Sequence, residues 1–298
     1  MAKTPDFQSV IGKGIGPRYM DYHWRDVILY ALAVGAKKTD LTYVWEKPGM
    51  KALPTFGLLP YLNSILMVPQ RHVPYAPGEL VGDLVIDALD GKIPNRLHMG
   101  VDLIMHQPIQ PYGGRFLTED EVEEVYDWGD KGIVSQTKME VYDGAGQPVC
   151  TMRNQHYIAA FGNNGREPFK SSKKQFPDRE PDFVVEDHIA ANLPVLYRLL
   201  GDTYTTHIDP KVAEGYGYRE PFVQGLCSAG FGCRMAIQAV IPNEPERVTH
   251  YGAQMRSVTF PDTDVVFKGW KIEEGVVYFK LIGEGGKAIL DNGILEYK

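Results

Sequence analysis

The stretch Gly225–Ile241, GLCSAGFGCRMAIQAVI, is small or apolar at nearly every position. A helix that is apolar on all sides is buried inside a protein, because it has no face suited to water. Four strand-like segments follow this stretch, namely Val248–Phe260, Val265–Ile272, Val276–Ile282 and Ala288–Tyr297. This order predicts a buried central helix wrapped by antiparallel strands.

The residues before this helix and the whole first half follow a similar order. Val185–Leu200 shows helical periodicity and ends at Gly201, which suits the end of a helix, and Asp209-Pro210 begins a short helical stretch. In the first half we expect helices at Arg25–Gly35 and Thr55–Val68, the latter interrupted by Pro60, and strands at Arg96–Met105, Ile133–Tyr142 and Val149–Phe161. The pattern predicts an α+β protein of two repeats, although the direct identity between the halves is weak.

A linker separates the two halves. Residues 162–181 read GNNGREPFKSSKKQFPDREP, which is rich in Gly, Pro, Ser and charge and offers little to bury. We therefore expect an N-terminal repeat over 1–165, a linker over 166–180 and a C-terminal repeat over 181–298. Two further stretches, Pro77–Pro94 and Gly113–Asp130, carry Pro, Gly and acidic residues and are expected as surface loops.

The composition is that of a folded globular protein. Of the 298 residues, 44% are hydrophobic and 23% are charged, which excludes wholesale disorder and a collagen-like repeat. The formal charge of −7 argues against a nucleic-acid partner, because such a partner calls for a basic surface.

Other features bear on the cellular location. The cysteines Cys150, Cys227 and Cys233 cannot all pair and show no CxxC spacing, so we expect reduced thiols. No apolar run reaches the roughly 18–20 residues that a membrane-spanning helix needs. The sequence shows neither a signal-peptide core nor a peroxisomal tripeptide. These observations predict a cytoplasmic protein without a membrane partner.

The common cofactor and hydrolase motifs are absent. There is no GxGxxG after a strand, no Walker A loop, no HExxH and no GxSxG. The eight histidines show no metal-ligand spacing. We therefore expect no metal site.

Asp202 and His207 are the candidates for chemistry. They lie five residues apart in a polar loop between a helix end and Asp209-Pro210, and such loops commonly hold reactive side chains. A carboxylate and an imidazole that meet at one water molecule supply a base for that water and an acid for a second proton. The spacing alone leaves a second interpretation open, in which Asp202 and Asp209 cap helices and His207 is a turn residue.

The segment Tyr197–Cys227 resembles the signature of the MaoC-like (R)-specific 2-enoyl-CoA hydratases, the hydratase 2 family. The matching residues are Tyr197, Arg198, Leu199, Gly201, Asp202, His207, Ile208, Asp209, Pro210, Ala213, Gly217, Gly225, Leu226 and Cys227. Three blocks of the first half, Arg25–Ala36, Tyr43–Glu46 and Leu53–Gly57, resemble the N-terminal half of the hydratase 2 unit in the peroxisomal multifunctional enzyme. The resemblance therefore spans most of residues 20–297.

The resemblance implies a double hot-dog fold, in which each half is an antiparallel sheet around a central helix and only the second half is catalytic. It implies that Asp202 and His207 activate a water molecule and that the backbone N–H of Gly225 donates to the thioester oxygen. The implied reaction is the reversible hydration of a trans-2-enoyl-CoA to an (R)-3-hydroxyacyl-CoA. The implied substrate is an acyl-CoA thioester, with no metal or redox cofactor, and a homodimer is expected.

The chain departs from the family pattern at several positions. The family Asn is Tyr204 here, the following Pro-Leu is Thr205-Thr206, and the His before Gly-Leu is Gln224. We assign substrate-binding roles to Tyr204, Gln224, Leu226 and Glu46, although a solvated Glu46 is an open alternative.

Other residues have two interpretations each. His98 matches a position of the family pattern, and a packed, hydrogen-bonded histidine is the alternative. Lys170–Lys174 either meets the CoA phosphates or forms a solvated hinge. The aromatic residues of the first half either line the acyl pocket or pack in the core; they are Tyr19, Tyr22, Trp24, Tyr61 and Tyr75. Two other functions remain open, a thioesterase on the same fold and a degenerate acyl-CoA-binding protein.

Overall fold

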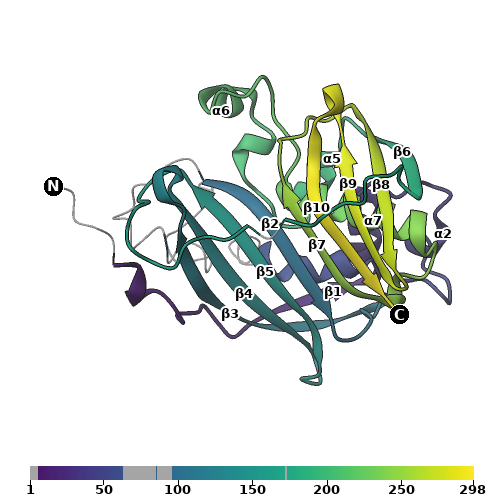
Figure 1. The fold of residues 1–298 in the computed structure, drawn as a ribbon. Coiled ribbons are helices and arrows are strands. Elements are labelled where there is room, and N and C mark those ends of the chain that lie inside the picture. The colour runs from purple at the N-terminus through teal and green to yellow at the C-terminus, as the bar shows by residue number, and fades with distance from the viewer. Residues whose placement is uncertain (1–5, 63–84, 86–95, 172) are drawn as a thin grey trace.

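The computed structural model describes residues 6–62, 85, 96–171 and 173–298. Its ten strands form one antiparallel sheet in the order β1-β3-β4-β5-β2-β7-β10-β9-β8-β6 (Figure 1). The first half supplies β1 Arg18–His23, β2 Arg96–Met105, β3 Gly113–Asp127, β4 Ile133–Asp143 and β5 Pro148–Ile158. The second half supplies β6 Phe183–Ile189, β7 Val248–Met255, β8 Thr263–Glu273, β9 Val276–Ile282 and β10 Ala288–Tyr297.

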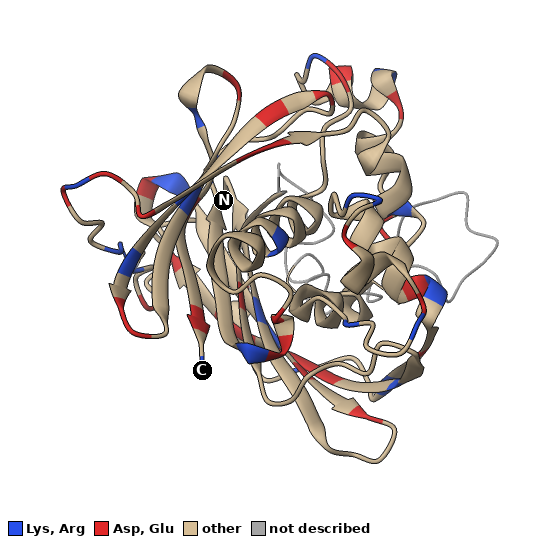
Figure 2. Cartoon of the chain, turned by 90° about the vertical axis from the view of Figure 1, so that its right-hand side faces the viewer, with Lys and Arg blue, Asp and Glu red and all other residues tan. Residues whose placement is uncertain are grey.

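The helices gather on one face of this sheet (Figure 2), and the longest of them, at residues 225–240, carries Arg234 as its one charged residue. The α-helices are α1 Trp24–Ala33, α2 Leu41–Val44, α5 Leu193–Arg198, α6 Pro210–Gly215 and α7 Gly225–Val240. The 3-10 helices are η1 Phe7–Ser9, η2 Pro54–Leu58, η3 Gly129–Lys131, η4 Thr205–His207, η5 Pro245–Arg247 and η6 Glu284–Gly286. No helix in the described part of the chain is long and apolar enough to cross a membrane.

The two halves meet at the pairing of β2 with β7. The register runs from Gly100 opposite Gln254 to Ile104 opposite His250. His250 Nε2 also lies 2.7 Å from Asp102 Oδ1 across this seam. The backbone pairing makes one continuous sheet from two halves of the chain.

Helix α7 is the centre of the second half, as the sequence predicts. Its residues from Leu226 to Ile237 are all buried, and it contacts β2, β6, β7, β8 and β10. Small residues permit this close packing: a β-carbon at Gly230 would lie 2.6 Å from Val34 Cγ1 at the end of α1. The α+β class and a helix wrapped by strands are thus confirmed for the second half.

Several predicted elements agree with the structure. The strands at 96–105, 276–282 and 288–297 have the predicted bounds, and the other predicted strands differ by a few residues at their ends. In the Thr55–Val68 segment, η2 is followed by helical residues at 60–62, and the remainder lies outside the described residues. The predicted loop at Pro77–Pro94 also lies outside them, apart from Val85.

Two predictions are wrong. The expected helix at Val185–Leu200 is the edge strand β6 followed by α5, since residues 183–188 alternate between half-buried and exposed positions and pair with β8. The expected loop at Gly113–Asp130 contains β3, which pairs with β1 and β4. Acidic side chains such as Glu119 and Glu121 alternate with buried residues such as Val122, so the segment is a strand with one polar face. Asp120 is the buried exception and pairs with Arg18.

The linker packs across the sheet rather than standing free in solvent (Figure 1). The Lys174 N–H donates to Asn292 Oδ1 at 3.2 Å, and the Phe176 ring lies 5.2 Å from Trp270. The Lys174 ammonium lies over the Tyr278 ring, and burial lowers its pKa. Lys170 and Lys173 of the basic run are exposed, and the Lys170 side chain is 81% exposed.

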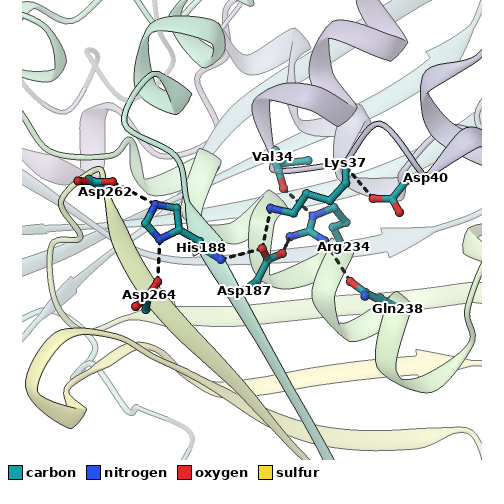
Figure 3. A network of polar contacts seen from close by, with 9 residues as sticks. All are labelled: Val34, Lys37, Asp40, Asp187, His188, Arg234, Gln238, Asp262 and Asp264. Carbon is teal, nitrogen blue, oxygen red and sulfur yellow. Dashed lines mark hydrogen bonds and ion pairs between the residues drawn. The ribbon is translucent and has the colours of Figure 1, made fainter.

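A buried ion network joins the two halves beside α7 (Figure 3). The Arg234 guanidinium of α7 pairs with Asp187 of β6 and donates to the carbonyl of Val34 at the end of α1. Lys37 Nζ lies 2.6 Å from the other Asp187 oxygen. Because Arg234 is only 3% exposed, its charge depends on this carboxylate for compensation.

We predict that Asp187→Asn destabilises the fold. Removing one partner of a buried ion pair leaves an uncompensated charge, which costs roughly 3–5 kcal/mol of unfolding free energy. Urea unfolding measures the loss. Asp264→Asn is the matched control, because the Asp264 side chain is 93% exposed beside His188. It should change the unfolding free energy by less than about 1 kcal/mol. Equal losses in the two variants would contradict the prediction.

The contribution of Asp187 also depends on pH. Burial raises the pKa of Asp187, but the charge of Arg234 and hydrogen bonds from Lys37 and Arg234 outweigh it, so the net pKa is lowered. The stabilisation is therefore complete above the unfolded aspartate pKa of about 3.9 and is lost as the pH falls through the lower folded pKa. The difference in unfolding free energy between wild type and Asp187→Asn should be constant from neutral pH to about 5 and shrink below about 4.

Candidate active site

Asp202 lies at the end of α5 and is buried. The chain turns at Gly201, whose φ of 125° suits glycine, and the N–H of Tyr204 donates to Asp202 Oδ1 at 3.4 Å. Burial raises the pKa of Asp202, against the opposing charges of His207 and Arg198. Asp202 therefore caps no helix, whereas Asp209 does cap α6 by accepting the N–H of Lys211 at 2.8 Å.

His207 ends η4, and its orientation is fixed by one hydrogen bond. Its Nδ1 lies 2.7 Å from the carbonyl oxygen of Phe222. A carbonyl oxygen only accepts, so Nδ1 must carry the hydrogen, and the neutral imidazole then has its lone pair at Nε2. The Phe222 ring packs edge-on against the imidazole at 4.8 Å. A neutral His207 in this orientation therefore keeps Nε2 as a hydrogen-bond acceptor.

The N-terminus of α7 supplies hydrogen-bond donors. Gln224 is the N-cap residue, and its carbonyl accepts the Ser228 N–H at 3.0 Å. Helix geometry leaves the N–H of Gly225 without an intrahelical acceptor, and the helix dipole makes this end attractive to negative charge. Leu226 is buried next to it.

Gln224 ties this helix end to α5. Its Nε2 donates to the carbonyl of Pro194 at 3.0 Å, and the whole residue is buried. No described residue donates to its Oε1. The side chain that replaces the family histidine therefore anchors α7 and keeps one buried acceptor.

Tyr204 points toward His207. The two ring centroids are 6.5 Å apart and the rings are nearly perpendicular, at 86°. Burial raises the pKa of Tyr204, and the phenols of Tyr61 and Tyr216 raise it further. The tyrosine that replaces the family asparagine therefore lies near both His207 and Tyr61 of the first half.

Glu46 lies elsewhere. It is exposed, and Lys51 in the same loop donates to the carbonyl of Asn243 and pairs with Glu246 beyond the C-terminal end of α7. A helix of 16 residues spans about 24 Å, so this loop and Gly225 lie at opposite ends of α7. No described contact brings Glu46 to Asp202 or His207.

The first-half aromatic residues divide between core and surface. Tyr22 packs in the core against Phe56 and Phe116, whereas Tyr19 and Trp24 are exposed. Tyr61 is buried and stacks on His156. Tyr75 lies outside the described residues.

The three cysteines are free thiols, and all are buried. Burial raises the pKa of Cys227, and its Sγ lies 3.3 Å from the carbonyl of Ala33. A thiol with a raised pKa is a poor nucleophile, which argues against a catalytic cysteine. Among the residues that the structure describes, no three His, Cys, Asp or Glu side chains converge as metal ligands.

Two family models match the chain in succession. The MFE-2 hydratase 2 N-terminal domain matches residues 20–160, and the MaoC like domain matches residues 172–289. The chain belongs to the MaoC-like hydratase 2 family. This assignment confirms the resemblance carried by Tyr197–Cys227 and by the three blocks of the first half.

Relatives of this hydratase 2 family chain cover almost its full length. It is 26% identical to a probable enoyl-CoA hydratase 2 of Dictyostelium discoideum, over 98% of this chain and 96% of that protein. It is also 26% identical to the peroxisomal multifunctional enzyme type 2 of Mus musculus, over 99% of this chain but only 39% of that longer protein.

Solved structures confirm the double hot-dog fold. A MaoC-like dehydratase from Phytophthora capsici superimposes with a TM-score of 0.81 at 24% identity, covering 98% of this chain and 99% of the other. A Mycobacterium tuberculosis protein with a double hotdog fold superimposes with a TM-score of 0.55 at 12% identity, covering 96% and 95%.

The burial of Asp202 predicts that Asp202→Asn stabilises the hydratase 2 chain. A folded protein loses unfolding free energy when a buried aspartate with a raised pKa must ionise inside it. The loss grows as the pH rises from the unfolded pKa of that aspartate through its folded pKa. A neutral amide avoids this cost, so the variant should melt at a higher temperature than wild type at pH 7, by an amount that shrinks toward pH 4. Thermal unfolding followed by circular dichroism measures both effects.

The matched control is Asp209→Asn, at the exposed cap of α6. Asn and Asp are comparable N-caps, so the melting temperature should change little at either pH. A destabilised Asp202→Asn at pH 7 would show that the Asp202 carboxylate is compensated in the folded chain and would contradict the prediction.

Proposed function

We propose that this chain hydrates trans-2-enoyl-CoA reversibly to (R)-3-hydroxyacyl-CoA, as a hydro-lyase. The observation that carries the proposal is the hydrogen bond from His207 Nδ1 to the Phe222 carbonyl, which leaves Nε2 as a base in the loop that holds the buried Asp202. The Dictyostelium relative, named as a probable enoyl-CoA hydratase 2, supports the same reaction.

The proposed chemistry uses one water molecule and two side chains. His207 Nε2 takes a proton from water while the water oxygen bonds to C3 of the enoyl group. The C2=C3 electron pair moves onto C2 and the thioester carbonyl, which gives an enolate. Asp202, whose pKa is raised by burial, gives a proton to C2 on the same face. The added O–H and C–H groups together account for one water, and a proton returns from His207 to Asp202 to reset the pair.

The Gly225 N–H is proposed to stabilise the enolate oxygen. The first N–H of a buried helix is oriented before the reaction begins, so it costs no rearrangement when charge develops. A donor of this kind is worth roughly 2.7–4 kcal/mol in the transition state. Leu226 and Gln224, which flank Gly225, and Tyr204, which lies beside His207, are proposed to contact the acyl thioester.

Other features remain proposals. We propose that the chain acts without a metal or redox cofactor, as a homodimer in the cytoplasm, with no nucleic-acid or membrane partner. Light scattering of the purified chain tests the dimer. A direct measurement of the cellular location tests the cytoplasmic proposal, because named relatives include peroxisomal proteins. Glu46 stays a substrate-binding prediction that a binding assay of Glu46→Gln tests.

We predict that Asp202→Asn and His207→Asn each lower kcat for enoyl-CoA hydration by about 10²–10⁴-fold. The amide of His207→Asn can still donate to the Phe222 carbonyl, so that variant removes the base while keeping the loop in place. The loss of enoyl-thioester absorbance measures hydration, and chiral analysis identifies the (R) product. His188→Gln, at an exposed histidine paired with Asp262 and Asp264, is the control and should retain wild-type kcat.

Two outcomes would replace the proposed function. Release of free CoA, detected with a thiol reagent, without loss of enoyl absorbance would assign a thioesterase. Acyl-CoA binding with neither signal would assign a degenerate binding protein, in which Tyr204 and Gln224 have removed the chemistry.

A further inference from the structure

A histidine of the first half packs directly on the helix end that carries Gly225. A β-carbon built on Gly225 would lie 3.0 Å from Nδ1, 3.2 Å from Cβ and 3.4 Å from Cγ of His98. These distances are tighter than most β-carbon contacts, so His98 fills the space beside Gly225 that a β-carbon would need. His98 belongs to β2, the strand that joins the two halves.

The His98 ring is held on two sides. Its Nε2 lies 3.1 Å from the carbonyl of Gly100, which only accepts, so Nε2 carries the hydrogen and donates. Its face stacks on His156 of β5, with centroids 4.8 Å apart and planes 16° apart. Tyr61 also stacks on His156, with centroids 6.4 Å apart and planes 20° apart. The Tyr61–His156–His98 stack is thus a column of three near-parallel rings.

Both ends of this column meet the candidate active site. One end is the contact of His98 with Gly225. At the other end, the Tyr61 phenol is near enough to raise the pKa of Tyr204, whose ring lies beside His207. His156 and Tyr61 are buried, so the column is packed within the protein interior. The first half therefore packs against the site at Gly225 and lies near it at Tyr204.

We propose that His98 is a positioning residue: its ring seats Gly225, and so fixes the direction of the N–H that stabilises the enolate. The role rests on the proposed function. An oxyanion donor acts only when it lies about 2.7–3.1 Å from the developing charge. A misplacement of about 1 Å can cost about 10²-fold in rate. A ring locked by a hydrogen bond and a stack keeps the helix end within that tolerance.

The first experiment compares His98→Ala with His98→Phe. His98→Ala empties the space beside Gly225, so kcat and kcat/KM should fall together, by roughly tenfold to 10²-fold, with KM little changed, because the affected contact is made in the transition state. His98→Phe restores the ring and should recover most of that loss without changing the pH profile. A phenylalanine variant as inactive as the alanine variant would show that a ring in this space does not seat Gly225, which overturns the positioning role.

The second experiment is a double-mutant cycle. Gly225→Ala adds the β-carbon that crowds His98 and should lower kcat, whereas Gly225→Ala with His98→Ala has room for it and should be faster than Gly225→Ala alone. The same four proteins are compared by melting temperature, which needs no activity. The contact between His98 and Gly225 would be overturned if the two single variants act independently. In that case the double variant shows the product of their kcat losses and the sum of their melting-temperature losses. His106→Ala is the control, since His106 lies 2.8 Å from Thr151 Oγ1 in the first half, and it should keep wild-type kcat.

The two failures are distinguishable. A wild-type chain that does not hydrate enoyl-CoA overturns the proposed function and with it the role of His98 in that reaction, even where the melting temperatures show coupling. An active wild type whose His98 and Gly225 variants are independent overturns only the positioning role.

Discussion

The backbone pairing of β2 with β7 is the constraint on which the rest of the structure depends. It places a strand of the first half beside the sheet that surrounds α7. Once this register is set, His98 near the start of β2 reaches the first residue of α7. The same seam carries the His250–Asp102 contact. Each half alone would expose a sheet edge, at β2 or at β7, and the pairing of these strands covers both edges. The two halves thereby share one interior.

That shared interior holds an apolar helix whose polar groups need special arrangements. Arg234, in the middle of α7, is compensated by Asp187 and by the Val34 carbonyl. At the N-terminal end, Gln224 bonds to the Pro194 carbonyl. The N–H groups of the first turn remain as donors, since no helix can satisfy them internally. The polar groups along the central helix thus have partners, whereas its N-terminal N–H groups remain available as donors. That end is where the proposed reaction would develop negative charge.

Local patterns predicted the elements that a single periodicity decides. The apolar run at Gly225–Ile241 gave α7, and β2, β9 and β10 have the predicted bounds. The edge strand β6 was predicted as a helix because Val184, Val185 and Ile189 also fit a helical spacing. Only the pairing of this segment with β8 decides between a helix and a strand. Within the site, Asp202 and His207 were candidates from their spacing in a polar loop, and their roles and that of Gly225 followed from the family resemblance. No local signal placed Glu46 at the far end of α7 or His98 against Gly225, because both positions depend on the pairing of distant strands.

The division of work between the halves follows from these contacts. The first half has no Gly-Asp…His counterpart to the Asp202–His207 loop. Three of its parts nevertheless contact the second half: the β2 strand, the Tyr61–His156–His98 stack and the Val34 carbonyl. Each contact orders a part that a lone second half would leave exposed: the sheet edge at β7, the Gly225 end of α7 and the Arg234 charge. A repeat can therefore lack reactive side chains and still determine the geometry of the reaction, because a helix dipole and a backbone N–H act only where packing holds them.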